Sequence, residues 1–216
     1  GAGDLRAVNL LHSYGGLQVG RHGEMSGPHG ARSVVPLAAR RPLRPGEQAL
    51  LVAADATAQP LLQEMAADFD SAVTLARPDG PDLVLLRVAS LDLLTHGNFP
   101  ATAAGGQNDG RPTLFAVYRY MDRRLGELYD ALDGNDVLVV MSDHGIRTAL
   151  QHDPQAMFVA VGASVPAGRL PDEPELRGVP RMIADFFGLA SAWPATGIER
   201  WVPGRQPRPA AAPAAP

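Results

Sequence analysis

The chain of 216 residues has no cysteine, and its 19 basic residues are all arginine, so it has no lysine either. The absence of cysteine excludes thiol nucleophiles, thiolate metal sites and disulfides, and it removes any redox clue to the compartment. The absence of lysine excludes Schiff-base chemistry and the phosphate-binding loop that depends on a lysine.

Strong charge and long apolar runs are also absent. A formal net charge of −4 and a pI near 5.8 give no reason to expect nucleic acid or an anionic membrane as a partner. No apolar run approaches the length of a membrane span, and residues 1–6 lack the basic-then-apolar pattern of a signal peptide. The sequence predicts neither a compartment nor an oligomeric state.

Three regions differ in composition. Residues 1–46 are rich in Gly, Arg and Pro without clear periodicity, and we interpret them as an irregular segment. Residues 47–204 alternate apolar runs with helical spacing and predict one α/β domain. Residues 205–216 form a Pro/Ala tail, expected to be disordered.

Short apolar runs predict strands at residues 49–55, 83–88, 137–141 and 157–161. Helical spacing predicts helices at 57–69 and 179–187, the latter closed by Gly188. A longer helix begins near Pro112, and its apolar residues at helical spacing are Phe115, Tyr118, Met121, Leu125, Leu128 and Leu132. This alternation predicts an α/β fold with a largely parallel sheet sandwiched by helices.

The sequence Ser142-Asp143-His144-Gly145 directly follows one of the predicted strands. Open α/β sheets place their ligand sites where a strand ends and a loop begins. A carboxylate beside an imidazole at such a point suits a divalent metal. The alternative interpretation is a turn in which the aspartate caps the next segment.

Two further elements carry ligand-type side chains. Asp92 and His96 lie four residues apart after a predicted strand, so a helical turn places both on one face, within reach of one ion. A surface pair or a capping aspartate is the alternative. His152 follows His144 by eight residues and is a further candidate ligand. The alternative for His152 is a solvated loop histidine. We interpret the remaining histidines, in the Gly-rich N-terminal part, as loop residues: His12, His22 and His29.

Five motifs occur in a specific order: Pro81–Leu86, Ser90–His96, Tyr120–Gly126, Val139–Gly145, and His152 before Met157–Gly162. This order resembles the alkaline phosphatase superfamily, and its nearest branch is the type I phosphodiesterase/nucleotide pyrophosphatase group. The segment from Val179 to Leu189 resembles the closing helix of that group. The resemblance covers roughly residues 81–190, more than half of the chain.

The resemblance implies an alkaline phosphatase-like fold that hydrolyses phosphate mono- or diesters with two divalent metals. It implies one metal site formed by Asp92, His96 and His152, and a second metal bound by Asp143 and His144. Mixed His and Asp ligands favour zinc, with manganese or iron as alternatives. The implied partner is a small phosphoester substrate.

The N-terminal part departs from the family pattern. Members begin with a strand that ends in a metal-binding Asp, followed by a Thr or Ser nucleophile, whereas we find no apolar strand before residue 49. Asp4 weakly resembles that metal-binding Asp. Ser26 and Ser33 are the nucleophile candidates. We therefore expect an N-terminally incomplete domain with weak or no turnover. The alternative is a non-catalytic remnant or metal-binding module of the same fold, without the nucleophile.

Overall fold

The computed structural model describes residues 40–52, 54, 56–77, 80–98, 111–148, 150–169, 175–202 and 204, together with the backbone of 7–10. The chain divides into two compact units. The helical unit comprises Gly1–Ala131 and Ile146–Gln151, and the C-terminal unit comprises Leu132–Gly145 and His152–Pro216. The predicted tail, the N-terminal histidines, Asp4, Ser26 and Ser33 lie outside the described residues.

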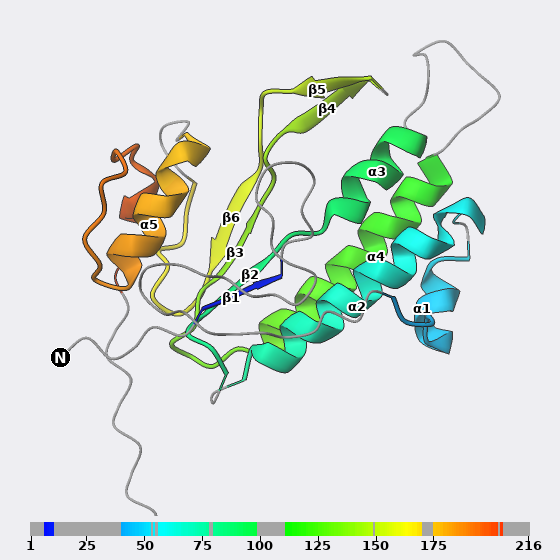
Figure 1. Ribbon diagram of the computed structural model, residues 1–216, viewed down its shortest axis with the longest axis horizontal. Helices are drawn as coiled ribbons and strands as arrows, with labels where there is room; N and C mark the ends of the chain where they lie inside the picture. The colour runs from blue at the N-terminus through cyan, green and yellow to red at the C-terminus, as the bar shows by residue number, and fades with distance from the viewer. Residues whose placement is uncertain are drawn as a thin grey trace, which may run out of the picture. The chain divides into compact units, whose positions relative to one another are not determined.

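In the described part of residues 1–131, the helical unit contains four α-helices, one 3-10 turn and two strands (Figure 1). The helices are α1 (Pro45–Leu50), α2 (Gln59–Leu75), α3 (Ala89–Asn98) and α4 (Arg111–Asp130), with the 3-10 turn at Ala56–Ala58. Strands β1 (Ala7–Leu10) and β2 (Leu83–Leu86) pair in parallel, with Ala7 opposite Leu83 and Leu10 opposite Leu86.

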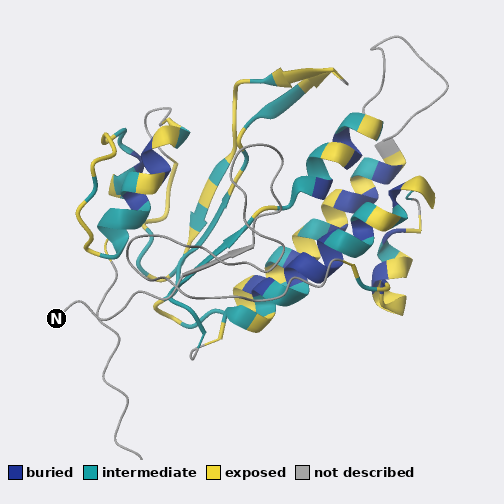
Figure 2. Ribbon diagram, in the orientation of Figure 1, coloured by how far each residue is buried: buried dark blue, intermediate teal, exposed yellow. Residues whose placement is uncertain are grey.

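The core of this unit forms where α2, α3 and α4 meet. Leu62, Met65 and Phe69 recur at helical spacing on α2, and their side chains are at most 1 % exposed. Leu94 of α3 and Val117 of α4 belong to the same buried cluster. Figure 2 shows buried residues along α2 and α4. Each fully buried side chain of this size contributes about 1.5–3 kcal/mol relative to an exposed one. The helix predicted at 57–69 is confirmed by α2, whose apolar face packs in this core.

Helix α4 occurs where the sequence predicts it, and its predicted apolar face is confirmed in part. Leu128 is 9 % exposed, and Met121 and Leu125 pack against the core. The first two members of that face are wrong. Phe115 is 67 % exposed and Tyr118 is 53 % exposed, whereas Val117, Tyr120 and Arg124 are almost completely buried. The buried face includes an arginine because its charge is paired inside the unit, as described below. A hydrophobicity pattern assigns such a residue to the solvent side, so the pattern missed the burial of Arg124.

The strand predicted at residues 49–55 is also wrong, because α1 occupies its beginning. Pro45 stands in the first helical turn, where its missing N–H costs no hydrogen bond. The Glu47 side chain accepts a hydrogen bond from the backbone N–H of Arg44 at 2.7 Å, which caps the new helix. The apolar run therefore enters the core as a helix and a turn, with Leu51 2 % exposed.

The expectation that no strand precedes residue 49 is wrong as well. Ala7–Leu10 forms β1, and its backbone pairs with β2. A run of four residues is short for recognition from pattern alone, and its strand state depends on a partner more than seventy residues later in the chain.

The C-terminal unit is built on β3 (Leu138–Met141) and β6 (Phe158–Val161) with one helix, α5 (Val179–Phe186). Val139, Phe158 and Ala160 pack against a cluster of buried residues that comprises Val179, Met182, Ile198 and Val202. Short 3-10 turns at Leu176–Gly178 and Ile198–Trp201 flank α5 in sequence. Gly188 closes α5 as predicted, with φ +66°, and the N–H of Leu189 donates to the carbonyl of Ala184 at 2.8 Å.

The predicted largely parallel sheet is corrected by the pairing of these strands. The described residues form three two-stranded sheets, and β3 pairs with β6 in antiparallel register. The connection between them holds only the paired strands β4 (Gly145–Thr148) and β5 (Gln151–Asp153). A parallel pair needs a long crossover, usually through a helix, and this connection has none. The mixed helix and strand content agrees with the α/β expectation, and among the strands that the structure describes, β1 and β2 are the pair in parallel register.

No helix in the described ranges combines the length and the apolar character that crossing a membrane requires.

Candidate metal centre

Helix α3 presents Asp92 and His96 on one face, as their spacing predicts. The Nε2 atom of His96 lies 3.3 Å from Oδ1 of Asp92. Between them, Leu94 is 2 % exposed and Thr95 is 8 % exposed, so the opposite side of the helix enters the core. Helix packing thus fixes the rotation of α3 and keeps both ligand-type side chains partly accessible, with 43 % of Asp92 and 27 % of His96 exposed.

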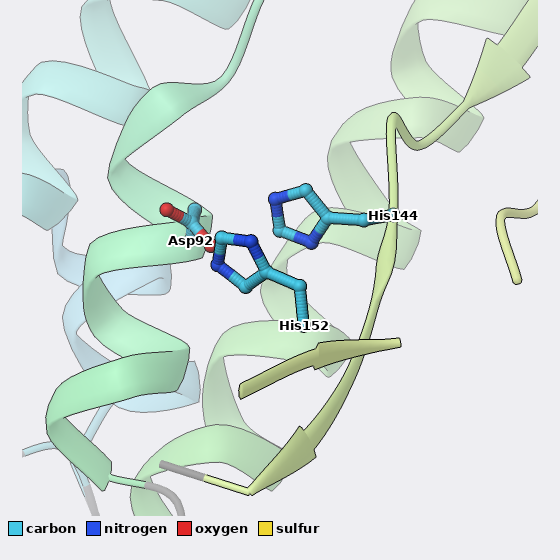
Figure 3. Close-up of side chains that lie close together, drawn as sticks. All are labelled: Asp92, His144 and His152. Carbon is cyan, nitrogen blue, oxygen red and sulfur yellow. The ribbon is translucent and has the colours of Figure 1, made fainter. Parts of the chain in front are cut away.

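In the C-terminal unit, Asp143 and His144 follow the end of β3, where the sequence predicts them. The rings of His144 and His152 stack with centroids 3.7 Å apart and an interplanar angle of 11° (Figure 3). Figure 3 also labels Asp92 on α3, which belongs to the helical unit. The Asp143 carboxylate is 76 % exposed and lies 3.6 Å from Nε2 of His144. His152, for which a metal ligand is the prediction and a solvated loop histidine the alternative, lies in β5 and stacks on His144.

A hydrogen bond defines the tautomer of His144. Its Nδ1 atom lies 3.0 Å from the carbonyl oxygen of Gly145. A carbonyl oxygen only accepts, so Nδ1 carries the proton, and the lone pair of the neutral ring is on Nε2. Metal-binding histidines commonly fix their tautomer in this way, by donating the other ring N–H to a carbonyl or carboxylate.

The stacked pair supplies two nitrogen donors for divalent cations. His144 and His152 each offer a ring nitrogen, and the two nitrogens lie within 4.8 Å of one another. Because the ring planes are nearly parallel, their in-plane lone pairs point side by side and not toward one point, so each ring suits a cation of its own. The donor set of imidazole and carboxylate also matches the preference of zinc. The residues therefore fit the metal that the sequence predicts.

The predicted ligands are divided between the units. Asp92 and His96 lie in the helical unit, and Asp143, His144 and His152 lie in the C-terminal unit. The shared site of Asp92, His96 and His152 combines both units and stays a prediction. The nucleophile candidates Ser26 and Ser33 stay predictions too, because they lie outside the described residues.

A buried charge cluster in the helical unit was not predicted from the sequence. The Glu47 carboxylate accepts hydrogen bonds from Arg41 at 2.5 and 2.6 Å, from Tyr120 at 3.1 Å and from Arg124 at 3.2 Å. Arg124 also binds Asp70 at 2.5 Å, and its side chain is 2 % exposed. Tyr120 and Arg124 both belong to the segment that resembles the family, but the sequence assigned neither of them to a buried charge cluster.

The pKa values in this cluster follow from burial and pairing. Burial by itself raises the pKa of Glu47, but hydrogen bonds from Arg41 and from the backbone of Arg44 outweigh it and lower the pKa from 4.5 to about 2. Burial, together with the charge of Glu47, raises the pKa of Tyr120. The cluster is therefore ionic at neutral pH, and we interpret it as structural, since it ties the residues around α1 to α2 and α4.

Comparison with known proteins places these elements in a family. The family model described as type I phosphodiesterase / nucleotide pyrophosphatase matches residues 32–160, more than half of the chain. The matched range contains all five candidate ligands and ends before α5, so the expected likeness of α5 to a closing helix stays a prediction. Neither the curated proteins nor the solved structures include a match. At the level of the family the activity is hydrolysis of phosphoesters. The chain belongs to the type I phosphodiesterase/nucleotide pyrophosphatase family.

Proposed function

We propose that the chain is a metal-dependent hydrolase of phosphate mono- or diesters, or the C-terminal portion of one. The observation that carries this proposal is the stacked pair of His144 and His152, with Asp143 beside it, at the end of β3. These residues lie within the range that matches the family. The family supports phosphoester hydrolysis, and the donor set supports a metal.

The proposed ligand sets follow the family resemblance. Asp92, His96 and His152 bind one cation, and Asp143 and His144 bind the second. Two cations held in this way supply Lewis-acid stabilisation of the attacking and leaving oxygens and of the phosphoryl charge. The residues of the chain hold the ions, and the carbonyl of Gly145 keeps His144 in the tautomer with its lone pair on Nε2.

Zinc is the proposed metal, with manganese or iron as alternatives. Neutral imidazole and carboxylate ligands suit each of them, and the absence of cysteine means that no thiolate selects among them. The nucleophile is proposed to be Ser26 or Ser33, since the family places a hydroxyl nucleophile before the first Asp/His pair. The substrate is a small phosphoester, and its identity depends on loops that vary independently of the core.

A second proposal, from another functional class, is a metal-binding module without catalytic activity. It keeps the same ligands and lacks the nucleophile. The two proposals agree on zinc binding and differ on turnover, so one set of measurements separates them.

The experiment combines metal analysis of the purified chain with assays on p-nitrophenyl phosphate and bis(p-nitrophenyl) phosphate, with and without zinc. We expect bound zinc and weak zinc-dependent turnover that disappears in Asp143→Ala. The matched control is Asp130→Ala, an exposed aspartate at the end of α4, which should keep the wild-type activity.

Zinc binding without turnover would support the metal-binding module instead. Robust turnover that disappears in Asp143→Ala would show that the nucleophile is present, and Ser26→Ala and Ser33→Ala would then identify it. A chain that binds neither zinc, manganese nor iron would contradict both proposals.

A further inference from the structure

Ser142 closes the base of the segment that carries three candidate ligands. It is the first residue after β3, and the register that pairs Met141 with Phe158 places Ser142 opposite Met157. The backbone N–H of Ser142 donates to the carbonyl of Met157 at 3.0 Å. In return, the N–H of Met157 donates to the Oγ atom of Ser142 at 2.9 Å.

The second of these hydrogen bonds uses the side chain of Ser142 in place of its backbone. In a regular antiparallel pair, two opposite residues exchange both hydrogen bonds through their backbones. Here the Oγ atom of Ser142 takes the place of the backbone carbonyl as the acceptor for Met157. The chain can therefore leave the sheet directly after Ser142 while the last rung stays closed. Asp143 and His144 are the first two residues after the chain leaves the sheet.

Gly145 fixes the other side of the same ligands. A Cβ atom at this position would lie 2.8 Å from the carbonyl oxygen of Gln155 and 3.3 Å from Cβ of Asp153. Contacts below 3.0 Å do not occur for real Cβ atoms, and the first obstacle is backbone, so any larger residue forces the two segments apart. The same glycine accepts the hydrogen bond from Nδ1 of His144.

We propose that Ser142 and Gly145 are positioning residues: they hold the two ends of the connection between β3 and β6 so that the ring nitrogens of His144 and His152 stay in place for the proposed cations. In the motif Ser142-Asp143-His144-Gly145, the two inner residues are the ligands and the two outer residues set their geometry. This inference rests on the proposed metal-binding function and extends it to residues that bind no metal.

The physical reason is the strictness of metal geometry. Zn–N bonds tolerate deviations of only about 0.2 Å, so affinity depends on ligands that are already held at the right separation. Loss of outer partners that orient metal ligands typically lowers metal affinity by about 10- to 100-fold. Ser142 and Gly145 act on both histidines. The hydrogen bonds between Ser142 and Met157 hold the two ends of the connection together. The close contact of Gly145 with Asp153 lies next to His144 on one strand and next to His152 on the other.

The test compares Zn²⁺ affinity in Ser142→Ala, Ser142→Thr and Ser191→Ala, by competition with a chromophoric chelator at a temperature where every variant is folded. Ser191 is the matched control, because its Oγ atom also accepts a backbone hydrogen bond, from Trp193 at 3.2 Å, in an exposed turn. We expect Ser142→Ala to lose about tenfold or more in affinity. Ser142→Thr keeps the hydroxyl and should restore it, and Ser191→Ala should match wild type. A Ser142→Ala variant that is less stable but binds Zn²⁺ as wild type does would overturn the proposal, since only a structural role would then remain.

Two measurements on metal-free protein separate this proposal from the proposed function. Hydrogen exchange of the Met157 amide should accelerate in Ser142→Ala, and the imidazole nitrogen shifts of His144 should show a second tautomer in Gly145→Ala. Wild-type protein without Zn²⁺ affinity would overturn the metal function. Unchanged amide exchange and an unchanged tautomer would overturn the positioning role by themselves.

Discussion

At the scale of single residues, the helical unit buries a group of paired charges around Glu47. Arg124 is 2 % exposed and Glu47 is 5 % exposed, so neither charge is solvated by bulk water. Their hydrogen bonds to each other, to Tyr120 and to Asp70 replace that solvation. A buried ion pair contributes little over a well-packed apolar pair, but removal of one partner leaves the other charge buried without compensation.

We therefore predict that Glu47→Ala lowers the free energy of unfolding by roughly 3–5 kcal/mol. Urea denaturation measures it. The control is Glu175→Ala, because Glu175 pairs with Arg177 on the surface and such pairs contribute about 0–1 kcal/mol. Equal losses in the two variants would show that the buried cluster does not stabilise the fold.

The pH dependence of stability follows from the lowered pKa of Glu47. Its pKa falls from 4.5 to about 2 on folding, so the folded state favours the carboxylate. The stabilisation is complete above the unfolded pKa and is lost as the pH falls toward the folded pKa. Between about pH 5 and pH 2, wild type should lose stability relative to Glu47→Gln, and the difference between them should shrink. A difference that stays constant over this range would contradict the assignment.

At the scale of elements, α5 ends at a glycine whose backbone conformation excludes most other residues. Gly188 has φ +66°, and the hydrogen bonds that close the helix depend on this conformation. Gly188→Ala should lower the free energy of unfolding by about 1–2 kcal/mol, because a Cβ atom is strained in the left-handed region. Gly134→Ala is the control, since Gly134 has no positive φ and open space at its Cβ position. Equal urea midpoints for both variants would show that the helix end does not need glycine.

At the scale of the whole molecule, the proposed zinc site links residues that are far apart in the chain. A ligand that binds only the folded state raises its stability by mass action, by about 2.7 kcal/mol at a concentration 100-fold above its Kd. Zinc should therefore raise the melting temperature of the wild type, and His96→Ala should lose most of this response. Calorimetry with and without zinc measures it.

The control for this measurement is His22→Ala, since we interpret His22 as a loop residue without a metal role. It should respond to zinc as wild type does. The same zinc-induced shift in wild type and in His96→Ala would show that zinc binds elsewhere on the chain.

The sequence by itself determined the features that depend on near neighbours. The helical repeat predicted α2 and α4, and the strand before Ser142 placed Asp143 and His144 at a strand end. A spacing of four residues put Asp92 and His96 on one face of α3. These predictions hold because helical periodicity and strand ends are set over a few residues.

The tertiary structure alone decided which segments meet. It buried Arg124 in place of Phe115, paired Ala7–Leu10 with β2, turned β6 antiparallel to β3 and stacked His152 on His144. Each outcome depends on a partner that is distant in sequence. A buried arginine is stable only where a carboxylate such as that of Glu47 accepts its hydrogen bonds. The periodicity of one segment carries no information about that partner, because pairing and burial energies arise only when the two segments are in contact.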